Sequence, residues 1–522
     1  MLKANAMKRF ALFLSLLFLQ QLNAQPNQAF GLLPLGNTPV GFKIVTVTDD
    51  TRLTGPGKNI LGEKVTTNRA RKITLHIWYP AELDAKASTM SLGDYALSYQ
   101  QEEVNQPVDA AARTRRFNTL RDQLKNFFGS VDEKDLEKCL AAPLLARKNA
   151  SPANGKFPVL VGMLRSFSTT LTNEFMASYG YIVVMVKPSP LPASVMSVRY
   201  IDEVQDLRRA TLYAIQSLNA DPEAIGSFGF SGAGFTQVLF SMNDYRPKAL
   251  ADLESGLYME GLWQSWSTCN YYDVNRLRIP FLHIFSRDLA KQEKYISEFK
   301  NTRFSRRYYL MLNQPALHHW DFATEGMISC TMLRMRGPQQ QNIQSSFELA
   351  NIYLLNFFNQ ELKNDKTAFN FMEHRPKLSN YHDSLWAMNI LPASKPAPTA
   401  DEFANLVTEK GVEEAIRILE SRLPEDSSTN LLDGSMMNRI GYNYLVGQQK
   451  KEAIAVFKLN VKLHPEEPNW QDSLLEGLVA DGRKEEARVV YKALNENIEK
   501  SSLPTDRKED MKKHANTLME KL

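Results

Sequence analysis

The sequence predicts an α/β fold with a mostly parallel sheet covered by helices on both faces, followed by an all-α domain of helical repeats. Three observations lead to this prediction. Between residues 157 and 312, short apolar segments alternate with helical stretches, and continuously apolar strands are typical of parallel sheets buried on both faces. A Gly-rich segment at 229–234 joins one such strand to a helix. Beyond residue 400, an apolar helical pattern recurs after 34 residues.

The first 24 residues have the features of a signal peptide. Lys3, Lys8 and Arg9 precede the apolar run 10–19, and a polar stretch leads to Ala24. Because this run is too short to span a bilayer, we expect cleavage after Ala24 and export to the periplasm or the exterior. Cleavage lowers the formal net charge from +4 to +1 by removing three positive charges. This balance gives no reason to expect a nucleic-acid partner, and no later segment is apolar enough to predict a transmembrane helix.

Cysteine usage excludes the common zinc patterns. Cys139, Cys269 and Cys330 are far apart, and the sequence has no Cys-x-x-Cys or His-x-x-x-His pair. One disulfide among the three is compatible with export. The length of 522 residues and the hydrophobic fraction of 43% allow two or three ordinary globular domains.

The first domain is expected to span residues 25–363. Alternating patterns predict two antiparallel opening strands at 41–47 and 73–80, and the charged, loosely helical segment 81–155 predicts an insertion or cap. The main elements follow in order: strands at 157–162, 181–186, 224–230, 249–253, 281–285 and 308–312, with helices at 171–179, 203–218, 235–240 and 347–358.

The rest of the chain reads as a linker and a helical domain. Residues 364–400 are polar and contain several prolines, which is typical of a linker. In 401–522, Glu452–Phe457 recurs 34 residues later as Glu486–Tyr491. A helix-turn-helix period of this length is the tetratricopeptide signature, and a plain helical bundle with a chance period is the alternative. Such repeats would offer a surface for a protein partner.

The segment 229–234 reads Gly-Phe-Ser-Gly-Ala-Gly and follows an apolar strand. A strand that ends in small-x-Ser-x-small and opens a helix is typical of a nucleophile elbow, where a strained turn exposes the serine. Gly229 fits this turn fully, whereas Ala233 stands where glycine is usual. The pattern predicts that Ser231 is the nucleophile of a serine hydrolase; a Gly-rich turn with a structural serine is the alternative.

The base is predicted by elimination among eight histidines. Six of them lie in predicted strands, in the linker or in the helical tail: His76, His283, His374, His382, His464 and His514. His318 and His319 follow the last predicted strand, so their loop reaches the sheet edge where the elbow serine is exposed. Of the two, we favour His319.

Two carboxylates at the same sheet edge can supply the acid that orients the imidazole. Glu254 follows the strand 249–253 and Asp288 follows the strand 281–285, and both fit the chain order Ser, acid, His. The oxyanion hole needs two backbone N–H groups. Gly232 supplies one, and the loop after the strand 157–162 should supply the other from Phe167 or Ser166.

These motifs resemble the α/β-hydrolase superfamily, in particular secreted serine esterases of the dienelactone-hydrolase and platelet-activating-factor-acetylhydrolase type. The resemblance covers about residues 36–362. It rests on Gly41-Phe42, Ile77–Pro80, Phe175–Tyr181, Gly229–Gly234, Ala251–Ser255, and His319 with Phe322. Such enzymes often carry their acid after the strand that follows the elbow helix, which implies Glu254 over Asp288. Glutamate instead of aspartate, Ala233, and the lack of a His-Gly pair before the sheet depart from the pattern.

The combined expectation is an exported serine esterase with a Ser231–His319–Glu254 triad and an oxyanion hole at Gly232 and Phe167. Its substrate would be a small-molecule, lipid or carbohydrate ester, and the chemistry needs neither a metal nor an organic cofactor. One alternative is a peptidase of the same fold, which would need an acidic pair to hold a substrate amine. Another is a weakened hydrolase scaffold that acts as a binding protein through its repeats.

Overall fold

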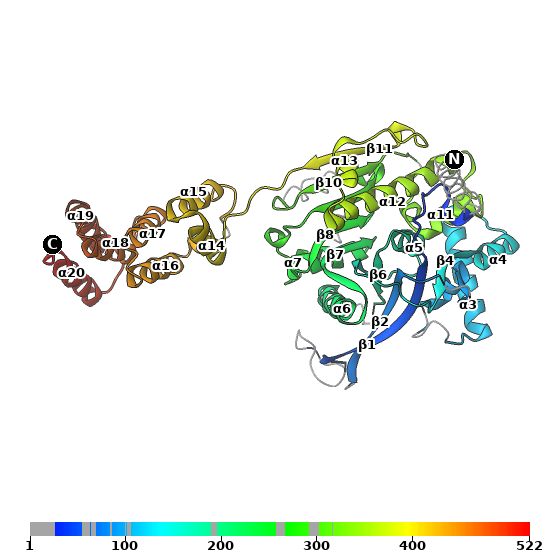
Figure 1. The fold of residues 1–522 in the computed structure, drawn as a ribbon, viewed down its shortest axis with the longest axis horizontal. Coiled ribbons are helices and arrows are strands. Elements are labelled where there is room, and N and C mark those ends of the chain that lie inside the picture. Colours follow the sequence, from blue (N-terminus) through cyan, green and yellow to red (C-terminus); the bar gives the residue numbers. More distant parts are fainter. Residues whose placement is uncertain are drawn as a thin grey trace, which may run out of the picture. The chain divides into compact units, whose positions relative to one another are not determined.

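The computed structural model describes residues 27–54, 63, 69–83, 86–99, 101, 106–188, 196–256, 267–291, 302–315, 317–427 and 429–522. The chain divides into two compact units, Met1–Ala393 and Ser394–Leu522 (Figure 1). The predicted signal peptide at 1–24 lies outside the described residues. Among the helices that are described, none combines the length and the apolar character needed to cross a membrane.

The first unit is built on a sheet of 11 described strands in the order β11-β10-β9-β8-β7-β5-β6-β2-β1-β4-β3 (Figure 1). Six neighbouring strands run parallel: β5 (Phe157–Met163), β6 (Ile182–Val186), β7 (Ala220–Phe230), β8 (Pro247–Leu253), β9 (Phe281–Ser286) and β10 (Arg307–Leu312). The strand β2 (Arg69–Pro80) pairs antiparallel with both β1 (Val40–Thr54) and β6. This topology is that of an α/β-hydrolase, so the predicted fold class is confirmed.

Helices cover both faces of the sheet because successive strand residues point to opposite sides. In β6, Val183 and Met185 pack into a core with α5 (Thr170–Ser178) and α12 (Gln340–Lys363). Their neighbours in β6, such as Val184, pack on the other face with α6 (Met196–Ser217) and α7 (Ala233–Asn243). Two apolar cores therefore enclose the parallel strands.

The segment 81–155, expected to be an insertion or cap, is helical in part and also extends the sheet. It contains β3 (Thr89–Ser91), α2 (Leu92–Ser98), α3 (Ala110–Phe128), α4 (Glu133–Ala141) and β4 (Pro143–Lys148). The strand β4 pairs with β1 and with β3, which lengthens the sheet at one edge. Tyr95 anchors the segment, since its hydroxyl donates to Glu174 Oε1 at 2.6 Å and accepts from Trp78 Nε1 at 2.9 Å.

Most of the segment 364–400, expected to be a linker, is structured in the first unit. It holds α13 (Lys366–His374) and β11 (Trp386–Leu391), and β11 pairs antiparallel with β10 along its whole length. Trp386 is buried, and its Nε1 donates to the Tyr353 hydroxyl at 2.8 Å. The composition misleads here because the short apolar strand Trp386–Leu391 lies between polar and Pro-bearing residues that dominate the segment.

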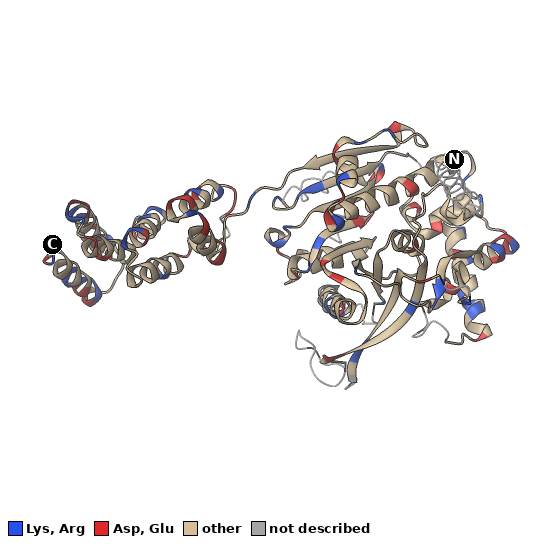
Figure 2. Ribbon diagram, viewed as in Figure 1, with Lys and Arg blue, Asp and Glu red and all other residues tan. Residues whose placement is uncertain are grey.

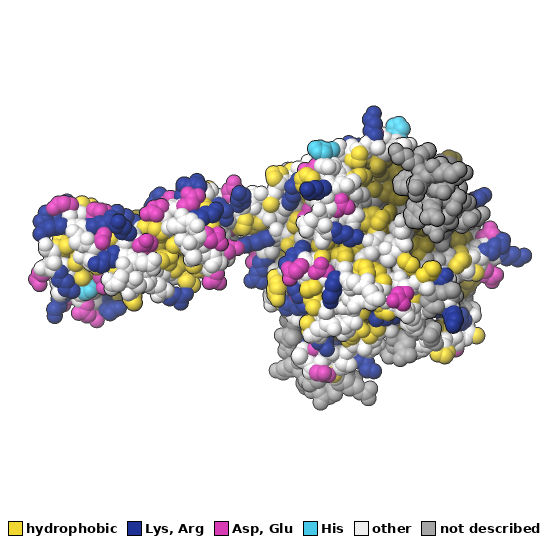
Figure 3. Space-filling view, in the orientation of Figure 1, with side chains coloured by type: hydrophobic (Ala, Val, Ile, Leu, Met, Phe, Trp, Pro, Cys, Tyr) yellow, Lys and Arg dark blue, Asp and Glu magenta, His cyan; other side chains and the backbone are white. Residues whose placement is uncertain are grey.

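The second unit consists of helices, most of which form consecutive pairs. They are α14 (Ala400–Lys410), α15 (Val412–Arg422), α16 (Gly434–Val446), α17 (Lys450–Leu463), α18 (Pro468–Ala480), α19 (Lys484–Lys500) and α20 (Thr505–Met519). The pair α18–α19 begins 34 residues after the pair α16–α17. Gly441 lets α16 approach α17 closely, because a Cβ there would lie 2.3 Å from the Phe457 ring. Lys, Arg, Asp and Glu residues occur along all of these helices (Figure 2), and their side chains are interspersed over the visible face (Figure 3).

Candidate active site

Ser231 lies in a sharp turn between β7 and α7, as the elbow motif predicts. Its φ of 55° is left-handed, a conformation that non-glycine residues rarely adopt. The turn is held by two backbone hydrogen bonds, from Ser231 N to Leu253 O at 3.0 Å and from Gly234 N to Ser231 O at 2.9 Å. The strain therefore lifts the serine hydroxyl above the carboxyl ends of the parallel strands.

Two glycines make this turn sterically feasible. A Cβ on Gly229 would lie 2.9 Å from the carbonyl carbon of Ala233, and a Cβ on Gly234 would lie 2.4 Å from Ser255 Cβ. Ala233, which replaces the usual glycine, is fully buried in the core on the α7 side of the sheet. The turn therefore accommodates Ala233, and the position next to it, Gly234, has no room for a side chain.

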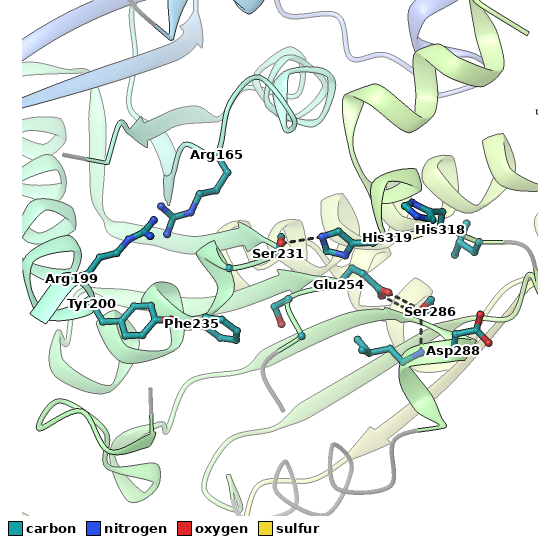
Figure 4. A pocket seen from close by; sticks show the side chains of 15 residues that line it. Arg165, Arg199, Tyr200, Ser231, Phe235, Glu254, Ser286, Asp288, His318 and His319 are labelled. Carbon is teal, nitrogen blue, oxygen red and sulfur yellow. Dashed lines mark hydrogen bonds between the residues drawn. The ribbon is translucent and has the colours of Figure 1, made fainter. Parts of the chain in front are cut away.

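His319 contacts the serine directly. Its Nε2 lies 3.0 Å from Ser231 Oγ, and its ring stacks on Phe230 with centroids 5.0 Å apart (Figure 4). Burial, and secondarily the neighbouring charge of His318, lower the pKa of His319 to about 4. The imidazole is therefore neutral at pH 7, which is the form that can accept a proton from the serine.

The adjacent residue His318 forms hydrogen bonds within its own loop. Its Nδ1 accepts a hydrogen bond from Trp320 N at 3.3 Å, and its backbone N–H donates to Asp321 Oδ2 at 2.7 Å. Asp321 is buried and is held by both Nη groups of Arg336 at 2.8 Å. This network fixes the loop, so the geometry brings His319 rather than His318 to Ser231.

Glu254 lies at the end of β8 and lines the same cavity as Ser231 and His319. It is 6% exposed and, like the serine, has a positive φ, of 46°. Its carboxylate accepts from Ser286 N at 2.6 Å and from Ser286 Oγ at 2.7 Å (Figure 4). Burial raises the pKa of Glu254 to about 7 against the opposing effect of these bonds. Within the described residues, its carboxylate bonds to Ser286 and forms no hydrogen bond to His319.

The alternative acid Asp288 also lines the cavity but is solvated. It belongs to the short helix α9 (Arg287–Ala290) that follows β9. Its side chain is 56% exposed and pairs with Lys291 Nζ at 2.6 Å. Of the two carboxylates, Glu254 is the buried one.

A second polar network, which the sequence did not predict, lies beside Glu254 in the sheet. Asp252 is fully buried, accepts from Ser255 Oγ at 2.5 Å and is hydrogen-bonded to His283 Nδ1. Asp252 and His283 are direct partners in the pairing of β8 with β9. Only this register reveals the pair, because the sequence shows His283 simply as a polar residue inside an apolar strand.

Of the predicted oxyanion donors, Gly232 lines the cavity, whereas Phe167 is not among the described residues that line it. Gly232 is the N-cap of α7, and Phe167 lies in the loop after β5. In the described part of the chain, neither backbone N–H has a hydrogen-bond acceptor. The Phe167 ring is buried and packs against the Arg116 guanidinium, while Ser166 has a φ of 60°.

The cavity above Ser231 has a volume of about 650 Å³. Besides the residues already described, its walls carry Leu317, Phe235, Tyr200 and two arginines, Arg165 and Arg199 (Figure 4). The sequence singled out neither arginine. Arg165 is in the loop after β5 and Arg199 is in α6, a helix whose first residues carry no recognisable motif.

No protein-family model matches the chain. No curated protein matches it either. Among solved structures, a ferulic acid esterase from Streptomyces cinnamoneus is similar, with a TM-score of 0.46 and 18% sequence identity over 69% of this chain and 98% of that one.

Proposed function

We propose that the protein is an exported serine hydrolase that cleaves carboxylic esters. The observation that carries the proposal is the 3.0 Å contact between Ser231 Oγ and His319 Nε2, made by a serine on a left-handed turn at the carboxyl edge of a parallel sheet. A nucleophile within hydrogen-bond reach of a neutral imidazole is the arrangement that acyl transfer requires. The fold is one on which this arrangement recurs.

The reaction proceeds through an acyl-enzyme. Ser231 Oγ attacks the ester carbonyl while His319 Nε2 takes its proton, and the imidazolium then gives this proton to the leaving alcohol. The N–H groups of Gly232 and Phe167 donate to the oxyanion of the tetrahedral intermediate. A water molecule, deprotonated by His319, releases the acid and restores the serine. Each of these steps balances with protein groups and water alone.

We assign the third catalytic role to Glu254. A carboxylate has about four lone-pair sites, and Ser286 uses one on each oxygen, so an oxygen of Glu254 keeps the capacity to accept from His319 Nδ1. Its burial favours this role over that of the solvated Asp288, because an ionic hydrogen bond to an imidazolium is stronger away from water.

Export and partner binding complete the proposal. Export is supported by the charged and apolar segments of residues 1–24. The 34-residue spacing of two helix pairs and the buried Ala453 and Ala487 at matching positions support a tetratricopeptide-like unit that binds a protein partner.

One observation favours a second candidate, a binding protein on a hydrolase scaffold. The Glu254 carboxylate is bonded to Ser286 instead of to the imidazole, as expected if the triad no longer functions. A peptidase that holds a substrate amine is less favoured, because the cavity presents two arginines where an acidic pair would be needed.

Labelling with a fluorophosphonate probe decides between esterase and binding protein. We expect the folded wild type to take up one probe per chain, at Ser231 by mass spectrometry, and Ser231→Ala to take up none. Ser255→Ala is the matched control, since Ser255 lines the same cavity but is bonded to Asp252, and it should still be labelled. A folded wild type that stays unlabelled would rule out the esterase.

A further inference from the structure

Two arginines from different elements converge in the wall of the cavity. Arg165 comes from the loop after β5 and Arg199 from α6, and both bind the same carboxylate, that of Glu203. Arg165 donates to it from both Nη groups, at 3.1 and 2.9 Å, and Arg199 donates from Nε at 2.9 Å. Figure 4 shows the two guanidinium groups on the opposite side of Ser231 from His319.

The charges in this cluster do not cancel. Two guanidinium groups face one carboxylate, and the Glu203 side chain is only 2% exposed, whereas those of Arg165 and Arg199 are 20% and 34% exposed. Glu203 also accepts from the Thr236 hydroxyl, so its oxygens are fully occupied. The cluster therefore presents one surplus positive charge to the cavity.

Arg199 also keeps hydrogen-bond donors that an anion in the cavity could use. Both Nη groups of Arg199 lack an acceptor within the described residues, although its Nε is fixed by Glu203. A guanidinium that is anchored at one edge and open at the other is pre-organised for two parallel hydrogen bonds to a planar anion. A purely structural ion pair with Glu203 would need Arg165 alone, which already makes the bidentate contact.

The acidic groups of the cavity lie on other elements. Glu254 follows β8 and Asp288 follows β9, on the His319 side of the cavity in Figure 4. A negatively charged substrate group would be repelled from these carboxylates and attracted to the arginines. The sign of the charge thus sets the direction in which a substrate lies across Ser231.

We propose that Arg165 and Arg199 form a subsite for a carboxylate carried by the substrate, so that the enzyme prefers anionic esters over neutral ones. The subsite rests on the proposed esterase function. It selects a class of ester by chemistry: one whose acyl or alcohol part bears a second, free carboxylate within reach of the arginines while the ester carbonyl lies at Ser231.

Matched ester pairs that differ only in charge test the preference. The carboxylate 4-acetoxybenzoate and the amide 4-acetoxybenzamide place the difference on the alcohol side, and monomethyl terephthalate and methyl 4-carbamoylbenzoate place it on the acyl side. We expect kcat/KM for the carboxylate to exceed that for the amide by about ten- to a hundred-fold in at least one pair. Arg199→Gln should bring this ratio close to one, and Arg199→Lys should restore part of it.

The control variant is Arg278→Gln, because Arg278 is exposed and is not part of the cavity wall. It should keep the full ratio. Equal turnover within both pairs, or a ratio that survives in Arg199→Gln, would overturn the subsite.

A binding experiment separates the subsite from the chemistry. By calorimetry, the Ser231→Ala protein should bind 4-acetoxybenzoate with at least ten-fold higher affinity than 4-acetoxybenzamide. Adding Arg199→Gln to this variant should remove the difference in affinity. If the fluorophosphonate probe fails to label but this binding is seen, the esterase is wrong and the anion subsite stands. If labelling succeeds and both ligands bind equally, the subsite is wrong and the esterase stands.

Discussion

Two residues at the catalytic edge, Ser231 and Glu254, have positive φ values although neither is glycine. Such a conformation costs a non-glycine residue about 1–3 kcal/mol and persists only where the surrounding structure enforces it. Each residue directly follows a parallel strand, β7 or β8, and each lines the same cavity. We infer that the strain serves to aim both side chains over the sheet edge.

The choice of acid can be tested by two isosteric changes. Glu254→Gln keeps the shape but removes the charge that stabilises the His319 imidazolium, so we expect kcat to fall about a hundred-fold or more. Asp288→Asn should leave kcat within about two-fold, because Asp288 is solvated and paired with Lys291. Steady-state turnover of a neutral ester measures both. A loss confined to Asp288→Asn would show that the acid is assigned to the wrong residue.

The pH profile gives a second test of Glu254. Activity needs a neutral His319, whose pKa of about 4 leaves it unprotonated above that pH, and an ionised Glu254, whose pKa is about 7. The proton that matters near neutrality is therefore the one on Glu254, and kcat/KM should rise with pH to a plateau above about 7. In Glu254→Gln this limb should move down toward pH 4, where only His319 titrates. An identical limb in the variant would exclude Glu254 as the titrating group.

At the scale of elements, the turn from β7 into α7 depends on how closely the helix passes β8. Gly234→Ala would bring a Cβ to 2.4 Å from Ser255 Cβ and 3.4 Å from Asp252 Cβ, so we expect a loss of about 1–3 kcal/mol in the free energy of unfolding. Gly232→Ala is the matched control, because its Cβ would meet nothing within 4 Å. Urea unfolding of the two variants compares them; equal midpoints would contradict the tight approach.

The elements that could be predicted are those whose burial appears in the sequence as a run of apolar residues. The parallel strands β5 to β10 are mostly apolar, and the loop with His319 follows the last of them, so both could be placed. The edge strand β11 could not, because its six residues lie between polar, Pro-bearing stretches that read as a linker. The bond between Glu254 and Ser286 was equally hidden, since it joins two strands whose register only the folded sheet defines. Arg199 was missed because it lies in no motif.

At the scale of the whole molecule, the apolar cores respect the boundary between the units. Two clusters lie within residues 29–391, and two others lie within residues 397–522. No core cluster of the described residues crosses Ala393. A chain organised in this way is expected to unfold in two separate transitions.

Truncation tests this independence. The fragment 394–522 should be helical and unfold cooperatively by circular dichroism, and the mature chain without it should still react with the fluorophosphonate probe. Calorimetry of the whole protein should then show two transitions whose midpoints match those of the fragments. A single transition, or a fragment without helical signal, would mean that the units depend on each other for stability.

The edge strand β11 has a mechanical consequence. The chain leaves this strand at Leu391, which pairs with Arg307 of β10, and enters the helical unit at Ser394. Tension applied to the helical unit by a tethered partner would therefore be borne first by the β10–β11 hydrogen bonds. The strands β8, β9 and β10 separate β11 from β7. A force that separates β11 from β10 would still leave β7, the strand before Ser231, paired with β8 and β5. The position of the nucleophile would therefore not change under such a force.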